Sequence, residues 1–134
     1  MKKINLLTLL GIVIFLGCNI VNNGKYKNDS IVCAKIRKVD FDILTFADVD
    51  CDSFDSFFEN FENQQINKKA TINYLQALIC KSNVASSKVN MNTRAKIYLI
   101  SINNIDTICI DQFHMYRDGK YYDTPNELID YLIK

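Results

Sequence analysis

The stretch from Ala95 to Asp123 reads AKIYLISINNIDTICIDQFHMYRDGKYYD. It is dense in β-branched and aromatic residues, which favour strands. Two dipeptides interrupt it: Asn103-Asn104 can take the positive φ of a tight turn, and Asp118-Gly119 is a stronger hairpin signal. The pattern therefore predicts antiparallel strands joined by hairpins. These strands are Ala95–Ile102, Ile105–Asp111, Gln112–Arg117 and Lys120–Asp123.

Helical periodicity lies on both sides of these strands. Lys69–Lys81 is predicted to be a helix because its apolar residues recur at helical spacing. A second helix is predicted after the last strand, where Thr124 suits an N-cap, Pro125 the first helical position and Glu127 the end of a capping box. The apolar stripes of these two helices are Ile72, Leu75, Leu78 and Ile79, and Leu128, Ile129, Leu132 and Ile133.

Three weaker patterns precede these elements. Lys35–Ala47 alternates between apolar and polar residues and is predicted to be a strand. Ser53–Phe61 carries phenylalanines at helical spacing and is predicted to be a short helix, while Asn63–Asn67 is expected to be a connection with room for an edge strand. Together the patterns predict an α+β fold, with an antiparallel sheet of about four strands and two main helices packed on one face.

The charge balance narrows the class of partner. The chain has 134 residues with 16 Lys+Arg and 15 Asp+Glu. Lys2 and Lys3 precede the candidate cleavage site described next, so residues 18–134 carry 14 basic and 15 acidic groups, a net charge of −1. A binder of nucleic acid needs a strong positive field, so we expect no nucleic acid partner.

The first residues have the pattern of an export signal. Lys2 and Lys3 are followed by the apolar run Leu6–Leu16, which is too short to cross a bilayer. The segment Phe15-Leu16-Gly17-Cys18 resembles the lipobox of bacterial lipoproteins, in which a peptidase cuts before a cysteine that carries lipid. Gly17 and Cys18 match the two strictest positions, whereas Phe15 and Leu16 depart from the usual residues. The alternative is an uncleaved apolar anchor that continues as far as Val21.

The lipobox resemblance implies a lipid on Cys18 and a place in the cell envelope. We expect a signal peptide at 1–17, a lipid-anchored flexible tether at 18–30 and a single small α+β domain at 31–134. Asn19 is not the Asp that retains some lipoproteins in the inner membrane, and no acidic cluster follows it. We therefore expect a lipid-anchored protein on the outer membrane that faces the periplasm.

Four cysteines remain after Cys18. An even number in an oxidising compartment makes them candidates for disulfides, with three connectivities that the sequence leaves open. The alternative is that they are free, buried thiols. Their spacing contains no CxxC pair of the kind that holds zinc. These residues are Cys33, Cys51, Cys80 and Cys109.

No basic residue occurs between Lys38 and Lys68, but eight acidic ones do. Within this run, Asp48, Asp50 and Asp52 have the spacing that opens an EF-hand-type calcium loop, and Glu59 falls at its twelfth position. Ser53 stands where such a loop needs glycine. A simpler explanation is that Asp52 or Ser53 caps the Phe-rich helix. We therefore expect no metal or cofactor, and a calcium-dependent binding module is the alternative function.

No catalytic motif accompanies the only histidine, His114, although Cys109 on a neighbouring strand could in principle pair with it. The sequence favours a non-catalytic, lipid-anchored domain that binds another envelope protein, in an inhibitor, immunity-type or envelope-assembly accessory role. Tyrosine and arginine suit interfaces. The expected contact surface is the last hairpin, with His114, Tyr116, Arg117, Tyr121 and Tyr122; the alternative is a plain solvent-facing side of the sheet.

Overall fold

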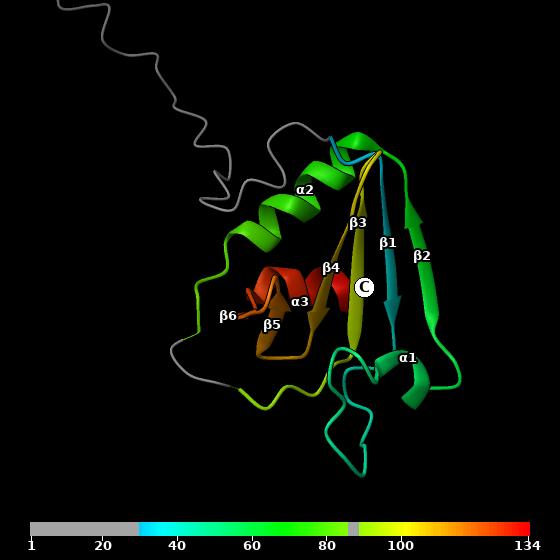
Figure 1. Cartoon of the computed structure of the whole chain (residues 1–134), viewed down its shortest axis with the longest axis vertical. Coiled ribbons are helices and arrows are strands. Elements are labelled where there is room, and N and C mark those ends of the chain that lie inside the picture. The colour runs from blue at the N-terminus through cyan, green and yellow to red at the C-terminus, as the bar shows by residue number, and fades with distance from the viewer. Residues whose placement is uncertain (1–29, 86–88) are drawn as a thin grey trace, which may run out of the picture.

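The computed structural model describes residues 30–85 and 89–134, and Figure 1 gives the arrangement of their elements. The expected signal peptide, lipid site Cys18 and most of the tether lie outside the described residues. In chain order the elements are β1 (Cys33–Lys38), α1 (Phe54–Phe57), β2 (Glu62–Ile66), α2 (Lys69–Cys80), β3 (Ala95–Ile100), β4 (Ile105–Ile110), β5 (His114–Arg117), β6 (Lys120–Asp123) and α3 (Asn126–Ile133).

The six strands form one open sheet in the order β2-β1-β3-β4-β5-β6, and every neighbouring pair is antiparallel. The mixed α+β class is thus confirmed, but the expected count of about four strands is wrong. β2 has no alternating hydropathy pattern in the sequence, because four of its five residues are exposed and only Ile66 is buried. It is held instead by its ladder to β1, in which Ala34 lies opposite Ile66.

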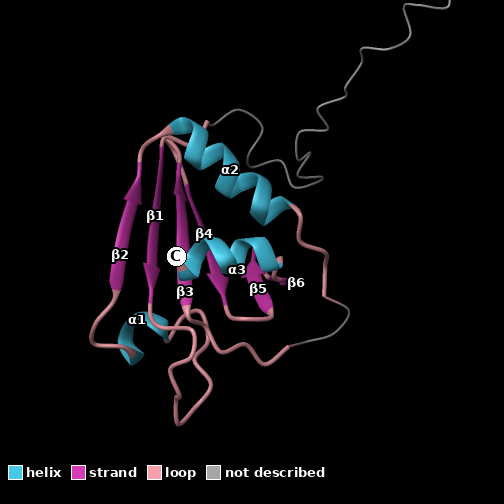
Figure 2. Ribbon diagram, turned by 180° about the vertical axis from the view of Figure 1, so that it is seen from behind, coloured by secondary structure: helices cyan, strands magenta, loops and turns pink. Residues whose placement is uncertain are grey.

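One face of the sheet is apolar and covered by helices. The register aligns Ile36 with Ile97 and Ile97 with Ile108, so that side chains from successive strands stack on the same side. Leu75 of α2 and Leu128 of α3 are fully buried in the same core cluster. Figure 2 shows α2 and α3 crossing this side, which we call the helix-covered face.

The opposite side of the sheet is the open face, and one end of it is covered. There the segment from 39 to 61 folds over the ends of β1, β3 and β4. Asp55 bonds Lys96 of β3, and Cys51 is bonded to Cys109 of β4. α1 therefore lies on the other side of the sheet from α2 and α3 (Figure 2).

The strand expected over Lys35–Ala47 ends at Lys38. Asp40 breaks it, because its side chain accepts the N–H of Asp42 at 3.0 Å and its carbonyl accepts that of Ile43 at 3.2 Å. The helix expected over Ser53–Phe61 is also shorter, since Phe58 is extended with ψ 136°. The phenylalanines pack as a ring cluster instead, with the Phe54 and Phe61 centroids 5.1 Å apart.

The start of α3 differs from the predicted capping box. Pro125 is the N-cap and no side chain caps the helix; the carbonyl of Pro125 accepts the N–H of Leu128 at 3.0 Å. Thr124 precedes this N-cap, and its N–H donates to the carbonyl of Phe113 at 2.8 Å. Its hydroxyl oxygen is buried and has no hydrogen-bond partner in the described part of the chain.

The two edge strands of the sheet, β2 and β6, differ in whether another segment hydrogen-bonds to their outer side. β6 is bordered by the segment 83–85, where Ala85 donates to the carbonyl of Tyr121 at 2.9 Å and Asp123 donates to that of Asn83 at 2.8 Å. Within residues 30–85 and 89–134, no strand pairs with the outer side of β2. None of the helices in these ranges has the length and apolar character required to cross a bilayer.

Candidate functional site

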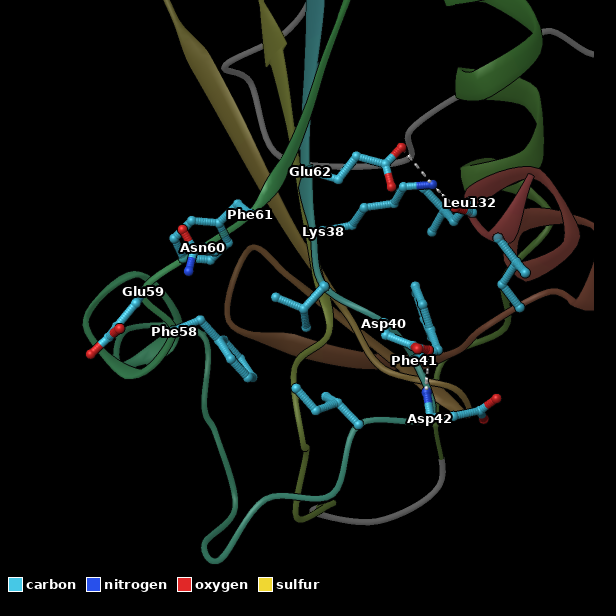
Figure 3. Close-up of a pocket in the computed structure, with 13 residues that line it drawn as sticks. Lys38, Asp40, Phe41, Asp42, Phe58, Glu59, Asn60, Phe61, Glu62 and Leu132 are labelled. Atoms are coloured by element: carbon cyan, nitrogen blue, oxygen red, sulfur yellow. Dashed lines mark hydrogen bonds and ion pairs between the residues drawn. The ribbon is translucent and has the colours of Figure 1, made fainter.

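A hollow of about 710 Å³ lies at the end of the sheet where β1 finishes. Three parts of the chain enclose it: residues 38–43, residues 58–62 and Leu132-Ile133 at the end of α3. We call it the acidic groove. Figure 3 shows that aromatic side chains from the first two segments, Phe41 and Phe58, line it together with several carboxylates.

Lys38 provides the link between β1, β2 and α3 in this groove. Its Nζ donates to the carbonyl of Leu132 at 2.5 Å and lies 3.2 Å from Oε1 of Glu62. The last carbonyls of a helix lack partners within the helix and favour a cation, so the ammonium group satisfies the end of α3. The positive charge of Lys38, which is 9% exposed, is thus already engaged.

The remaining charge of the groove is negative. Four carboxylates and one lysine line it, which gives a formal net charge of −3. Asp40 holds its own turn through Asp42 N, whereas the carboxylates of Asp42 and Glu59 have no cationic partner among the described residues. A cation that enters the groove would therefore meet carboxylates beside apolar side chains.

The wall of the groove continues into residues 43–46, which we call the tip loop. The segment before β3 holds this loop through one backbone and one side-chain contact. Arg94 Nη2 donates to the carbonyl of Ile43 at 3.0 Å, and Asn92 Nδ2 lies 3.2 Å from Oγ1 of Thr45. Burial lowers the pKa of Arg94 and the nearby carboxylate of Asp111 opposes this shift. Two side chains of the tip loop nevertheless point outward, with Leu44 96% and Phe46 94% exposed.

A second hollow of about 340 Å³ lies on the open face beside the last hairpin. It is lined by Tyr116 and Tyr121, whose ring centroids are 5.0 Å apart, together with residues 48, 50–52 and 89–91. We call it the tyrosine hollow. It brings part of the expected hairpin surface together with part of the acidic run.

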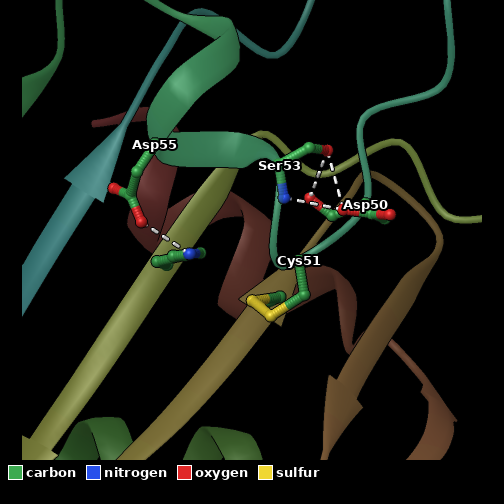
Figure 4. Close-up of a disulfide and its surroundings, with 6 residues drawn as sticks. Asp50, Cys51, Ser53 and Asp55 are labelled. Atoms are coloured by element: carbon green, nitrogen blue, oxygen red, sulfur yellow. Dashed lines mark hydrogen bonds and ion pairs between the residues drawn. A yellow bond between two sulfur atoms is a disulfide. The ribbon is translucent and has the colours of Figure 1, made fainter.

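Asp50 in this second hollow stabilises the turn that precedes α1. Its Oδ1 accepts hydrogen bonds from the hydroxyl and the N–H of Ser53, both at 2.7 Å, and these bonds lower the pKa of Asp50. Figure 4 shows this turn directly above the disulfide from Cys51 to Cys109. The carboxylate therefore braces the entry to α1.

The candidate calcium ligands do not converge. Asp48, Asp50 and Asp52 line the tyrosine hollow, whereas Glu59 lines the acidic groove, because the chain leaves α1 in an extended conformation at Phe58. Over residues 30–85 and 89–134, no three His, Cys, Asp or Glu side chains come together in a way that could hold a metal ion. The calcium loop suggested by the spacing is not formed.

The candidate cysteines differ in their bonding state. Cys51 and Cys109 form a disulfide that closes a sequence separation of 58, while Cys33 at the start of β1 is a free thiol, contrary to its expected candidacy. Cys80 is not free. Cys18 lies outside the described residues.

The expected hairpin surface is split between the two faces. Since alternate residues of a strand point to opposite sides, Arg117 shares the helix-covered face with Met115, and Tyr122 lies opposite Met115. Arg117 Nη2 is 2.6 Å from Oδ2 of Asp106, and the two side chains are 12% and 6% exposed. Burial raises the pKa of Asp106 and Arg117 opposes that shift. The open face keeps His114, Tyr116 and Tyr121.

His114 also has local partners. Its N–H donates to Oδ1 of Asp111 at 2.6 Å, and its Nδ1 lies 3.7 Å from the same oxygen. The same carboxylate accepts the N–H of Phe113 and that of Asn92. Asp111 thus organises the turn between β4 and β5, and Cys109 is held in its disulfide.

The sequence showed the acidic run but not the groove that it forms. The missing signal is long-range: Lys38 and Leu132, which close the groove, are 94 residues apart. Comparison with known proteins adds no family to this picture, since no family model, curated protein or solved structure matches the chain.

Proposed function

We propose that this chain is a lipid-anchored lipoprotein of the bacterial cell envelope, and that its domain binds another envelope protein without catalysing a reaction. The proposed anchor rests on Lys2, Lys3, the apolar run Leu6–Leu16 and the Gly17-Cys18 pair. The proposed localisation is the periplasmic side of the outer membrane.

The observation that carries the binding role is the acidic groove. Binding sites commonly combine apolar walls with a few polar groups that fix orientation. The groove offers this combination, with Phe41 and Phe58 as walls and the carboxylates of Asp42 and Glu59 without cationic partners in the described region. Cys109 is held in a disulfide and His114 in the turn that Asp111 organises. Neither is placed as a nucleophile or a base, which favours binding over catalysis.

The position of the groove suits an anchored binder. Ser30, the first described residue, lies beside Lys69 and Ser101, at the end of the sheet where β1 begins. The groove lies where β1 finishes, and Figure 1 shows β1 running from one end of the sheet to the other. A lipid at the N-terminal end would therefore leave the groove on the side of the domain that is farther from the membrane.

Metabolic labelling with a fatty-acid probe tests the anchor. The wild type should take up the label and Cys18→Ser should not, and the substituted protein should keep its longer uncleaved signal. Cys33→Ser, which removes a free thiol, is the matched control and should stay labelled. Label retained in Cys18→Ser would contradict the proposal. So would a disulfide between Cys18 and Cys80, because a sulfur in a lipid thioether cannot also form a disulfide.

Site-specific cross-linking in the envelope tests the binding role. A photoreactive residue at position 42 or 59 should cross-link to one envelope protein, whereas the same residue at the exposed Lys120 should not. A further probe is placed at position 121. Cross-links obtained only from this probe would move the contact surface to the tyrosine hollow. The absence of cross-links from all of these positions would count against a binding domain.

A further inference from the structure

We propose that the acidic groove and the tip loop together receive a segment of a partner protein that carries Lys or Arg side chains between apolar ones. This inference rests on the proposed binding function and names the chemistry of the partner. The positive groups would meet Asp42 and Glu59, and the apolar side chains would cover Leu44 and Phe46.

The tip loop gives the first argument. Large apolar side chains that stay more than nine-tenths exposed are a mark of interaction sites when they are held together. Leu44 and Phe46 are 96% and 94% exposed, yet the chain around them is hydrogen-bonded to Asn92 and Arg94. Phe46 also rests against Phe57, with ring centroids 5.1 Å apart. The exposure is therefore built into an ordered loop.

Charge complementarity gives the second argument and excludes two other occupants. The groove has a formal net charge of −3, and two of its carboxylates, Asp40 and Asp42, precede the tip loop directly in the sequence. Anionic lipid headgroups would be repelled by these carboxylates. In a symmetric dimer through this surface, a second copy of the chain would bring two such grooves of like charge together, which opposes association. A positively charged protein segment has neither conflict.

The chain's own basic tether is also too short. Lys25 and Lys27 precede Ser30, which lies at the opposite end of β1 from the groove. β1 has six residues and spans about 20 Å at the rise of a strand. Five residues from Lys25 to Ser30 reach at most about 18 Å even when fully extended. The tether would have to run fully extended along the whole of β1 for one lysine side chain to reach the groove, which favours an occupant from another molecule.

The test uses the full chain in nanodiscs of neutral lipid and two short peptides, KLGKLGK and ELGELGE. Binding is measured by fluorescence anisotropy, with empty nanodiscs subtracted. The Lys peptide should bind and the Glu peptide should not. The double variant Asp42→Asn/Glu59→Gln should weaken binding about fivefold, because two exposed ion pairs are lost. Phe46→Ser should weaken it about tenfold, through the lost apolar contact.

A matched pair of carboxylates controls for charge alone. Asp48→Asn/Asp52→Asn also removes two negative charges, but from the tyrosine hollow, and should leave the affinity unchanged. Equal weakening by both double variants, equal binding of the two peptides or no binding at all would overturn the inference. Binding to anionic vesicles, or concentration-dependent dimers that Phe46→Ser abolishes, would overturn it in favour of a lipid or a second copy. The cross-linking result at positions 42 and 59 stands apart from these outcomes, so the two proposals can fail separately.

Discussion

Arg117 and Asp106 form an ion pair on the helix-covered face, where little water reaches either group. Removing one partner of a buried pair leaves the other charge without compensation and costs about 3–5 kcal/mol. We expect Arg117→Met to lose this much stability at pH 7, measured by urea unfolding. The double variant Asp106→Asn/Arg117→Met should regain much of it, because no buried charge remains.

The pH dependence of the same variant has a defined sign. Burial raises the pKa of Asp106 in the folded state, so the folded protein takes up this proton more readily than the unfolded chain. The resulting stabilisation is complete below the unfolded pKa and is lost as the pH rises through the folded one. Without the opposing Arg117, the shift grows. The loss in Arg117→Met should therefore be smaller at pH 4 than at pH 7, and an equal loss at both would contradict this account.

The placement of Arg117 was within reach of the sequence. Met115 is a core residue of the last hairpin, and residues two apart in a strand share a face. The same rule puts Arg117 on the inner side and leaves Tyr116 on the outer one. The pairing with Asp106 was not predictable in this way, because it depends on the register between β4 and β5.

α3 is fixed to the sheet by its apolar stripe rather than by a cap. Leu128 is 0% exposed, so Leu128→Ala should cost about 2–5 kcal/mol. Thr124→Val should leave the free energy of unfolding unchanged or raise it, because it replaces a buried hydroxyl that has no partner in the described region. Thermal or urea unfolding of the two variants checks this. A loss of stability in Thr124→Val would contradict this account and would support the capping role that the sequence suggested.

The turn between β5 and β6 depends on left-handed backbone. Asp118 has φ 49° and Gly119 has φ 74°, as a tight hairpin turn requires. A Cβ added at Gly119 meets nothing within 4 Å, so Gly119→Ala tests the conformation alone and should cost about 1 kcal/mol. Asp118→Gly is the control and should cost less. Equal costs for the two would indicate that the turn has another conformation in solution.

Elements with strong periodicity were predicted well. α2 was expected over Lys69–Lys81 and spans Lys69–Cys80, and all four strands of the last two hairpins are present. The strand and the helix that ended early both lie between β1 and β2, where the chain wraps around the end of the sheet and local alternation no longer indicates a strand. Asp40 ends β1 with a local turn that alternation of apolar and polar residues does not reveal. Phe58 is extended and packs in the ring cluster, which no local pattern contains.

For the molecule as a whole, the disulfide from Cys51 to Cys109 ties the segment between β1 and β2 covalently to β4. A bridge over a sequence separation of 58 restricts the unfolded chain strongly, and its loss typically costs about 2–4 kcal/mol. We expect Cys51→Ser/Cys109→Ser to lose stability by this amount, and reduction of the wild type to have a similar effect. Cys33→Ser should be nearly neutral. A double variant as stable as the wild type would show that the bridge does not form.

The candidate site is the least local feature of the molecule. Its acidic residues stand close together in the sequence, but the groove exists only because the end of α3 returns to Lys38. The sequence predicted where the carboxylates are and missed what encloses them. Exposed Leu44 and Phe46 were likewise part of an expected strand, since hydropathy does not distinguish a buried apolar residue from one held in solvent.

The placement of Ser30 and the groove at opposite ends of β1 has a kinetic consequence. If residues 19–30 are the proposed tether, a flexible coil of that length would have an average reach of about 20 Å, and β1 would add a similar length. With its lipid in place, the groove would search a thin shell some tens of ångströms above the bilayer. Partners in the same membrane would then meet it at an effective concentration that can approach the millimolar range. A contact too weak to survive in dilute solution could be occupied continuously at the membrane, so the unanchored protein would lose its partner although its groove is intact.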